Sequence, residues 1–199
     1  MESKLVELNK KRHSIYALGE NLPLTQDEVY ELVTDTIQSS PTAFNSQTVR
    51  AVVLFGEKSN RVWDIVEETL RKIVPAENFQ STADKIASFR AGAGTILYFT
   101  DMPTVEKLEN DFKLYADNFK PWAEQAIGGA QQAVWVALAE QGIGASLQHY
   151  NPLIDDAIRA EFDLPAGWQL RAQMPFGSIE APAEDKPKLA KDEQFRLFN

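Results

Sequence analysis

A basic cluster near the start of the chain offers residue types that bind phosphate. Lys10, Lys11 and Arg12 are followed at once by His13 and Ser14. An arginine fork and a serine hydroxyl two residues apart can clamp a phosphate, because both donate hydrogen bonds to its anionic oxygens. The same cations also suit the end of a short helix over residues 5–12, where positive charge complements the helix dipole. Both interpretations remain open from these residues alone.

Two polar loops carry the other candidate binding groups. Residues 39–50 lie between a helix and a strand and combine small side chains and hydroxyl groups with the amides of Asn45 and Gln47. Because an amide both donates and accepts hydrogen bonds, this loop suits the polar edge of a large flat heterocycle. The alternative is a helix-ending turn in which Asn45 adopts a left-handed backbone conformation. A second loop, residues 146–152, again mixes amides with aromatic rings.

Composition excludes several classes of chemistry. The chain has no cysteine and only two histidines, His13 and His149, so we expect no thiol nucleophile, disulfide or metal site. No serine nucleophile motif accompanies His149, so a hydrolytic triad has no support and we name no catalytic acid or base. The net charge of -9 opposes nucleic acid binding. No apolar run approaches the length of a membrane span and no signal peptide is visible, so a cytoplasmic protein is expected.

The pattern of apolar residues predicts alternating helices and strands in one domain over residues 1–199. Thr25 and Glu28 form a capping box that begins a helix ending near residue 38. Residues 51–55 are an apolar strand of the kind that is buried on both faces. Gly92 and Gly94 precede a strand instead of following one, so they are not a dinucleotide-binding loop. Further helices are expected over residues 59–73, 81–90, 104–119 and 153–162, and further strands over residues 96–100 and 168–174.

A long helix over residues 122–141, set off from the preceding helix by Pro121, is rich in alanine and glycine. Small side chains let other helices approach closely, so it is either a buried central helix or one shared with a second subunit. The polar C-terminal tail, about residues 178–199, is expected to run over a surface, such as that of a partner subunit.

Four segments together resemble the nitroreductase family of flavin mononucleotide (FMN) enzymes, and in particular its short subgroup of bacterial and fungal proteins. They are the triplet Arg12-His13-Ser14, residues 40–47, residues 142–152, and Phe176-Gly177 followed by Lys186 and Lys188. Their order covers the chain from about residue 8 to residue 198.

The resemblance implies an α+β fold: a mixed, mainly antiparallel sheet flanked by helices, in an entwined homodimer with a long central helix. It implies FMN bound at the subunit interface, with residues 40–47 supplied by the other subunit and the two lysines near the phosphate. The implied FMN-binding residues are Arg12, His13, Ser14, Tyr16, Ser40, Pro41, Thr42, Asn45, Gln47, Leu147, Gln148, His149, Tyr150, Lys186 and Lys188.

The function implied is an oxidoreductase that takes electrons from NADH or NADPH and reduces nitroaromatics, quinones or similar small aromatic acceptors by a ping-pong mechanism. A flavin-binding redox or lipid-response regulator with little turnover is the alternative, and a flavin-free relative is a third possibility. Tyr16 stands where the family motif often has a basic residue. Lys85 or Arg90 could supply that charge.

Overall fold

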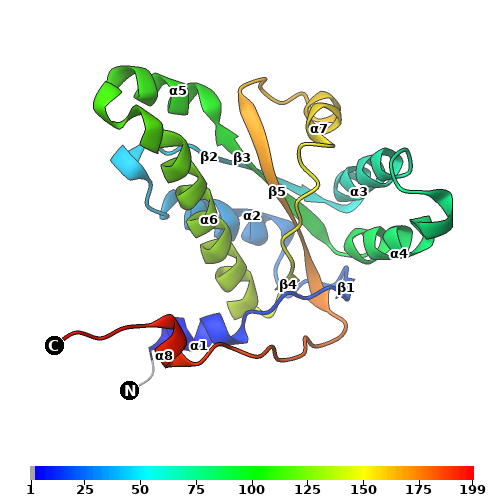
Figure 1. Ribbon diagram of the computed structural model, residues 1–199. Coiled ribbons are helices and arrows are strands. Elements are labelled where there is room, and N and C mark those ends of the chain that lie inside the picture. Colours follow the sequence, from blue (N-terminus) through cyan, green and yellow to red (C-terminus); the bar gives the residue numbers. More distant parts are fainter. Residues whose placement is uncertain (1–2) are drawn as a thin grey trace.

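The computed structural model describes residues 3–199, and its centre is an antiparallel sheet (Figure 1). The strands are β1 (Leu18–Gly19), β2 (Val49–Phe55), β3 (Gly94–Asp101), β4 (Gly144–Ala145) and β5 (Trp168–Ile179). Their order is β1-β5-β3-β2, with β4 also pairing with β5, and every paired strand is antiparallel. An isolated parallel bridge joins Ser14 to Ala145.

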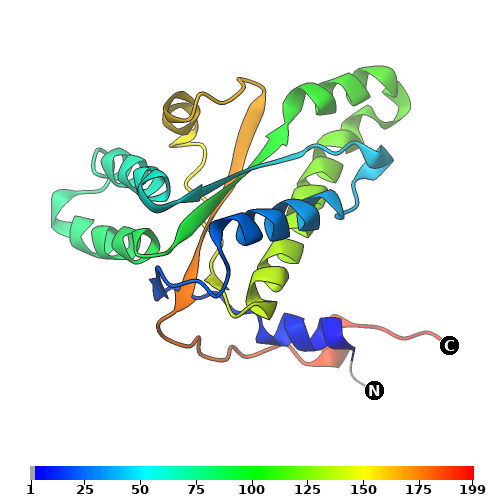
Figure 2. The same ribbon diagram turned by 180° about the vertical axis from the view of Figure 1, so that it is seen from behind.

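Helices cover both faces of the sheet, as the two opposite views show (Figures 1 and 2). On one face lie α2 (Gln26–Gln38) and α6 (Ala116–Glu140), which pack on Ile96 and Tyr98 of β3. On the other lie α3 (Gly56–Leu70), α4 (Phe79–Arg90) and α7 (Asp155–Glu161), which pack on Leu97 and Phe99. Alternate side chains of one strand thus enter two different cores, as a pleated strand requires.

The remaining elements are short or lie at the ends of the chain. They are α1 (Lys4–Lys11), α5 (Met102–Asp111), α8 (Lys191–Gln194) and the 3₁₀ turns η1 (Ala43–Asn45), η2 (Ala76–Asn78) and η3 (Lys113–Tyr115). The predicted capping box is present, since Thr25 accepts a hydrogen bond from the Glu28 backbone and the Glu28 carboxylate accepts one from the Thr25 backbone. Within residues 3–199, no helix is both long and apolar enough to cross a membrane.

The predicted boundary at Pro121 is wrong. The preceding helix ends at Asp111, and α6 runs without interruption from Ala116 to Glu140 with Pro121 inside it. Proline removes only one helical N–H, and Pro121 is exposed near the start of α6, where the freed carbonyl can meet water. The break falls instead at Phe112, whose backbone is not helical (φ -124, ψ 66) and whose ring packs on Phe44.

The expected burial of residues 51–55 on both faces is incomplete in the single chain. Their side chains pack against both cores, but in β2 only Leu54 is fully buried, whereas β3 is buried along nearly its whole length. The reason is position, because β2 is the end strand of the sheet and has one neighbour. The α+β class, the antiparallel sheet flanked by helices and the long helix are confirmed.

Candidate functional site

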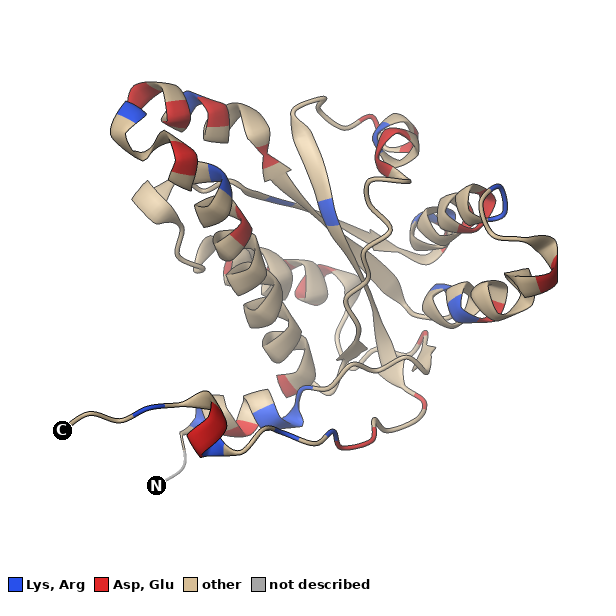
Figure 3. Ribbon diagram, in the orientation of Figure 1, with Lys and Arg blue, Asp and Glu red and all other residues tan. Residues whose placement is uncertain are grey.

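Both ends of the chain line one cavity of about 680 Å³, which we call the basic cavity. Its walls come from the end of α1 and the residues after it, and from the tail that follows β5. Figure 3 shows the charged residues of the tail alongside those of α1. The cavity therefore brings together six of the predicted site residues, Arg12, His13, Ser14, Tyr16, Lys186 and Lys188.

Three cations of the basic cavity, Arg12, Lys186 and Lys188, have no carboxylate partner among residues 3–199. Arg12 lies with its guanidinium carbon 4.4 Å from the ring centre of Trp135, and its buried Nε has no hydrogen-bond partner. In the described part of the chain neither Lys186 nor Lys188 forms an ion pair, and both are exposed. Glu184 and Asp185 line the same cavity, and the Asp185 carboxylate lies 4.0 Å from His13 Nε2. The cavity has positive charge to offer an anion.

The segment after Arg12 is tied to the end of β4, directly before residues 146–151, which we call the β4 extension. The Ile15 backbone donates to the Ala145 carbonyl at 2.9 Å, and Ser14 forms the parallel bridge to Ala145. The basic cavity and this predicted ring-binding segment are therefore neighbours.

Backbone N–H groups of the β4 extension alternate between two directions. Those of Ser146, Gln148 and Tyr150 all donate to β5, at 3.2, 2.7 and 2.8 Å. Those of Leu147 and His149 have no partner within residues 3–199. This is the pattern of an extended strand, which leaves one edge as a row of free donors.

The side chains of the β4 extension differ in exposure. The amide of Gln148 is buried and donates to Ser146 Oγ at 3.1 Å, whereas His149 is exposed. Tyr150 is half-buried, and burial raises the pKa of its hydroxyl, which stays protonated at neutral pH. Of these side chains, His149 is the one most open to a second ligand.

The polar loop over residues 39–50 is a tight turn. Phe44, Asn45 and Gln47 have positive φ values of 58, 49 and 47, so the predicted left-handed Asn45 is confirmed. Thr42 stabilises the turn, because its hydroxyl accepts from the Gln47 backbone at 3.0 Å and its carbonyl from that of Asn45. The side chains of Pro41, Asn45 and Gln47 remain exposed.

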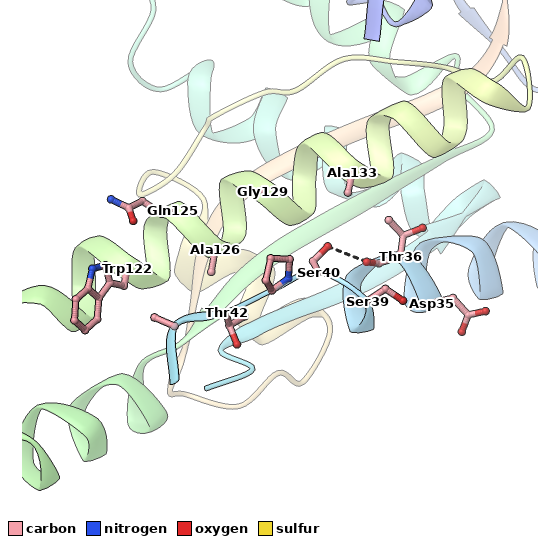
Figure 4. Close-up of a pocket in the computed structure, with 12 residues that line it drawn as sticks. Asp35, Thr36, Ser39, Ser40, Thr42, Trp122, Gln125, Ala126, Gly129 and Ala133 are labelled. Atoms are coloured by element: carbon pink, nitrogen blue, oxygen red, sulfur yellow. Dashed lines mark hydrogen bonds between the residues drawn. The ribbon is translucent and has the colours of Figure 1, made fainter. Parts of the chain in front are cut away.

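A second cavity of about 820 Å³ lies between this loop and α6, and we call it the interhelix cavity. Figure 4 shows the loop on one side, with Ser40 donating to the Thr36 carbonyl at 2.8 Å, and the small residues of α6 on the other. Residues of α6 that line it include Trp122, Ala126, Gly129 and Ala133.

The polar loop and the basic cluster contact different halves of α6. The loop contacts its beginning, where the Phe44 and Trp122 rings stack at 5.9 Å. The basic cluster contacts its second half, where Arg12 stacks on Trp135 and Lys11 donates to the Glu140 carbonyl at 3.4 Å. A rise of about 1.5 Å per residue separates Trp122 and Trp135 by about 20 Å along the helix. Within one chain, residues 40–47 are thus far from the basic cavity.

An aromatic cluster that the sequence does not predict lies beside the loop. The Phe44 ring, half-exposed, lies 5.1 to 6.1 Å from four other rings, those of Phe112, Tyr115, Phe119 and Trp122. Trp135 was missed as well. The aromatic residues between positions 112 and 122 were visible in the sequence, but nothing there indicated that they surround Phe44.

The structure distinguishes the two cations considered near Tyr16. Arg90 is bound to Asp64 at 2.8 Å and to Glu67 at 2.9 Å. Lys85 has no ion pair in the described residues, and its Nζ lies 5.9 Å from the ring centre of Phe89. That ring in turn lies 6.4 Å from Tyr16. Lys85 is therefore the available cation on the side of Tyr16.

Comparisons with known proteins agree on one family. The Nitroreductase family model matches residues 10–178. HBN1 of Saccharomyces cerevisiae is 37% identical over 190 residues, covering 94% of this chain and 93% of that protein. The nitroreductase FRM2 of the same yeast is 34% identical over 177 residues, 88% of each protein. The structure of nitroreductase CinD from Lactococcus lactis in complex with nicotinic acid has a TM-score of 0.92 and 43% identity, covering 98% of this chain and 100% of that one. The chain therefore belongs to the nitroreductase family.

Proposed function

We propose that the protein is an FMN-dependent oxidoreductase that uses NADH or NADPH to reduce nitroaromatics, quinones or similar aromatic acceptors. Family membership supports the reaction class. CinD has also been solved in complex with chloramphenicol and with 4-nitrophenol, and these structures share 43% and 42% identity with this chain. Flat aromatic molecules are therefore the first acceptors to test.

The donors of this chain suit FMN. Arg12, Ser14, Lys186 and Lys188 would hold its phosphate, because three unpaired cations and a hydroxyl meet in one cavity. The free N–H groups of Leu147 and His149 would bind the polar edge of its ring. The chemistry that FMN supplies when bound is acceptance of a hydride from NAD(P)H and delivery of electrons to the acceptor. The observation that carries this proposal is that both chain ends meet at the basic cavity, where Arg12, Lys186 and Lys188 have no carboxylate partner among the described residues.

A homodimer would complete the site. Gly128 and Gly129 lie at the middle of α6, are exposed, and have open space where a side chain would be. Each glycine in a helix interior costs about 1 kcal/mol relative to alanine, and this chain shows no packing reason for the pair. Close approach of a second α6 would explain both.

Antiparallel pairing of two α6 helices about Gly128 and Gly129 has a specific consequence. It sets Trp122 of one subunit opposite Trp135 of the other. Because Trp135 packs on Arg12, the loop beside one Trp122 would then lie near the other subunit's basic cavity. Residues Ser40, Pro41, Thr42, Asn45 and Gln47 would bind the flavin in trans, and the aromatic cluster would offer rings on which an acceptor stacks.

The C-terminal tail fits the same assembly. In one chain Phe195, Leu197 and Phe198 are exposed by 63, 83 and 90%. Burying three large apolar side chains would contribute about 1.5–3 kcal/mol each, so a covering surface is expected. We propose that residues 1–199 form one domain whose tail, from about residue 178, extends over the partner subunit.

Bleaching of the bound flavin tests the enzyme directly. The purified protein should be yellow, and anaerobic NADH or NADPH should remove its visible absorbance within the time of mixing. An added nitroaromatic or quinone should restore it. A yellow protein that neither nucleotide reduces would favour a flavin-binding regulator, and a colourless protein that takes up no FMN would contradict the proposal.

A further inference from the structure

One polar side chain in the apolar middle of β5 has no role in the site described so far. Gln173 is fully buried, and its neighbours Ala172 and Met174 are fully buried as well. A buried amide is costly unless its donor and acceptor are satisfied, so its partners show what it stabilises.

The amide of Gln173 bonds to the β4 extension. Its Oε1 accepts from the Tyr150 backbone N–H at 2.8 Å, and its Nε2 is 3.5 Å from Asn151 Oδ1. The Gln173 backbone also exchanges two hydrogen bonds with Gln148, at 2.7 and 2.9 Å. Main chain and side chain of one residue thus hold three residues of the segment 148–151.

The side chain replaces a backbone acceptor that β5 does not offer. Since Gln148 pairs with Gln173, the next acceptor in a regular antiparallel ladder for Tyr150 would be the Arg171 carbonyl. Arg171 is instead the extra residue of a bulge, because Tyr98 pairs with Ala172 and Phe99 with Leu170. The side-chain oxygen Oε1 of Gln173 accepts the Tyr150 hydrogen bond where the ladder ends.

This arrangement fixes which N–H groups stay free. With Gln148 and Tyr150 held toward β5, the N–H groups of Leu147 and His149 must point to the opposite edge. A slip of one residue would exchange the two sets. The Gln173 amide therefore holds the β4 extension at the point where it leaves the sheet. At that point no further ladder hydrogen bond sets the direction of the extension.

We infer that Gln173 is a positioning residue, whose buried amide holds residues 148–151 so that Leu147 and His149 present their backbone donors to the flavin. The inference rests on the proposed function for the identity of the ligand. We call the hydrogen bonds from Gln173 to residues 148–151 the clamp. It is present in the protein without ligand, and can be tested there.

Hydrogen exchange in the flavin-free wild-type protein is the first measurement. The Tyr150 amide should exchange slowly and those of Leu147 and His149 rapidly, and added FMN should slow the latter two. Equal protection of all three amides before FMN is added would overturn the inference, whether or not the protein proves to be an enzyme.

Variants then separate positioning from stability. Gln173→Met keeps the length of the side chain but loses the amide. It should speed Tyr150 exchange and weaken FMN binding by about tenfold each, because a buried hydrogen bond is lost. Gln173→Glu keeps an acceptor oxygen for Tyr150 and should restore the protection.

A buried hydrogen bond between α3 and β3 serves as the control. Ser59, which is 1% exposed, bonds to Thr95 at 2.7 Å. Ser59→Ala should lower the melting temperature comparably and leave Tyr150 exchange and FMN affinity unchanged. If Gln173→Met speeds exchange while FMN affinity stays at the wild-type value, Gln173 is structural only and the inference is wrong. If the wild type binds no FMN, the proposed function fails, while the exchange data still decide on the clamp.

Discussion

The guanidinium of Arg12 stacks on the ring of Trp135, 4.4 Å from its centre. Trp135 is itself fixed, because its Nε1 donates to the Ala145 carbonyl at 3.2 Å. One aromatic ring of α6 thereby joins the basic cavity to β4. A planar guanidinium held against a ring keeps its N–H groups in a defined direction, which favours binding of phosphate oxygens over a loose ion pair.

Replacement of Arg12 should weaken FMN binding. Each charge-assisted hydrogen bond contributes about 1.5–3 kcal/mol, so Arg12→Ala should raise the FMN dissociation constant by about tenfold or more. Titration of the flavin-free protein, followed by quenching of flavin fluorescence, measures this. Lys4→Ala is a matched control, because it removes a cation of α1 whose partner is Glu140 outside the cavity. Equal affinity of both variants would exclude Arg12 from the phosphate site.

Much of this site follows from local sequence. The capping box, the left-handed Asn45 and the basic ends of the chain are properties of short segments, and the structure agrees with each of them. The helix boundary at Pro121 and the burial of residues 51–55 were not predicted correctly, and the cause is shared. Neither the place of β2 at the sheet edge nor the tolerance of Pro121 in α6 is a local property.

The residues that were missed depend on tertiary contacts. The Phe44 cluster joins η1 to residues about 70 positions later, and Gln173 bonds to a segment 22 or more residues before it. The proposed place of residues 40–47 opposite the basic cavity depends on a second subunit. The sequence indicated that arrangement only through the family resemblance.

Lys85 should tune the flavin. A cation near the reduced ring stabilises its negative charge, so Lys85→Met should lower the midpoint potential and weaken formation of the flavin–sulfite adduct. A tenfold rise in the sulfite dissociation constant corresponds to about 30 mV for a two-electron couple. Arg90→Met is the comparison, because its charge is already bound by Asp64 and Glu67. Arg90→Met should lower stability and leave the midpoint potential unchanged. A potential that falls in Arg90→Met and stays unchanged in Lys85→Met would assign the role to Arg90.

Glu67 should make stability depend on acidic pH. Hydrogen bonds from Arg90 and Arg71 hold the pKa of its carboxyl below the usual range. A depressed pKa stabilises the folded state above the unfolded-state value of about 4.3, and this contribution is lost as pH falls through the folded-state pKa.

Urea unfolding of the wild type and of Glu67→Gln checks this. The wild type should be more stable at pH 7 by about 1 kcal/mol, and the difference should shrink below about pH 4.3. A difference that is constant from pH 7 to pH 3 would show that the Glu67 charge contributes nothing.

The kinetics should be ping-pong. One exposed face of a flavin holds one flat aromatic molecule at a time, so the nicotinamide and the acceptor should compete for it. Double-reciprocal plots with a quinone should be parallel, with competitive inhibition at high quinone concentration. His149→Ala should change the KM for acceptors by several-fold and leave FMN bound, because His149 is exposed beside the predicted ring site. Intersecting lines would require a ternary complex and separate sites.

The central claim is that each flavin site is built from two subunits, and a defined heterodimer tests it most directly. One subunit carries Arg12→Ala and the other Asn45→Asp, which retains the left-handed backbone that Asn45 adopts at φ 49. Two different affinity tags isolate the mixed dimer, and each parent homodimer should bind FMN weakly. In trans, the mixed dimer has one site with both defects and one with none, so it should bind a single FMN with wild-type affinity. Weak binding at both sites of the mixed dimer would show that each site lies within one chain and would contradict the account.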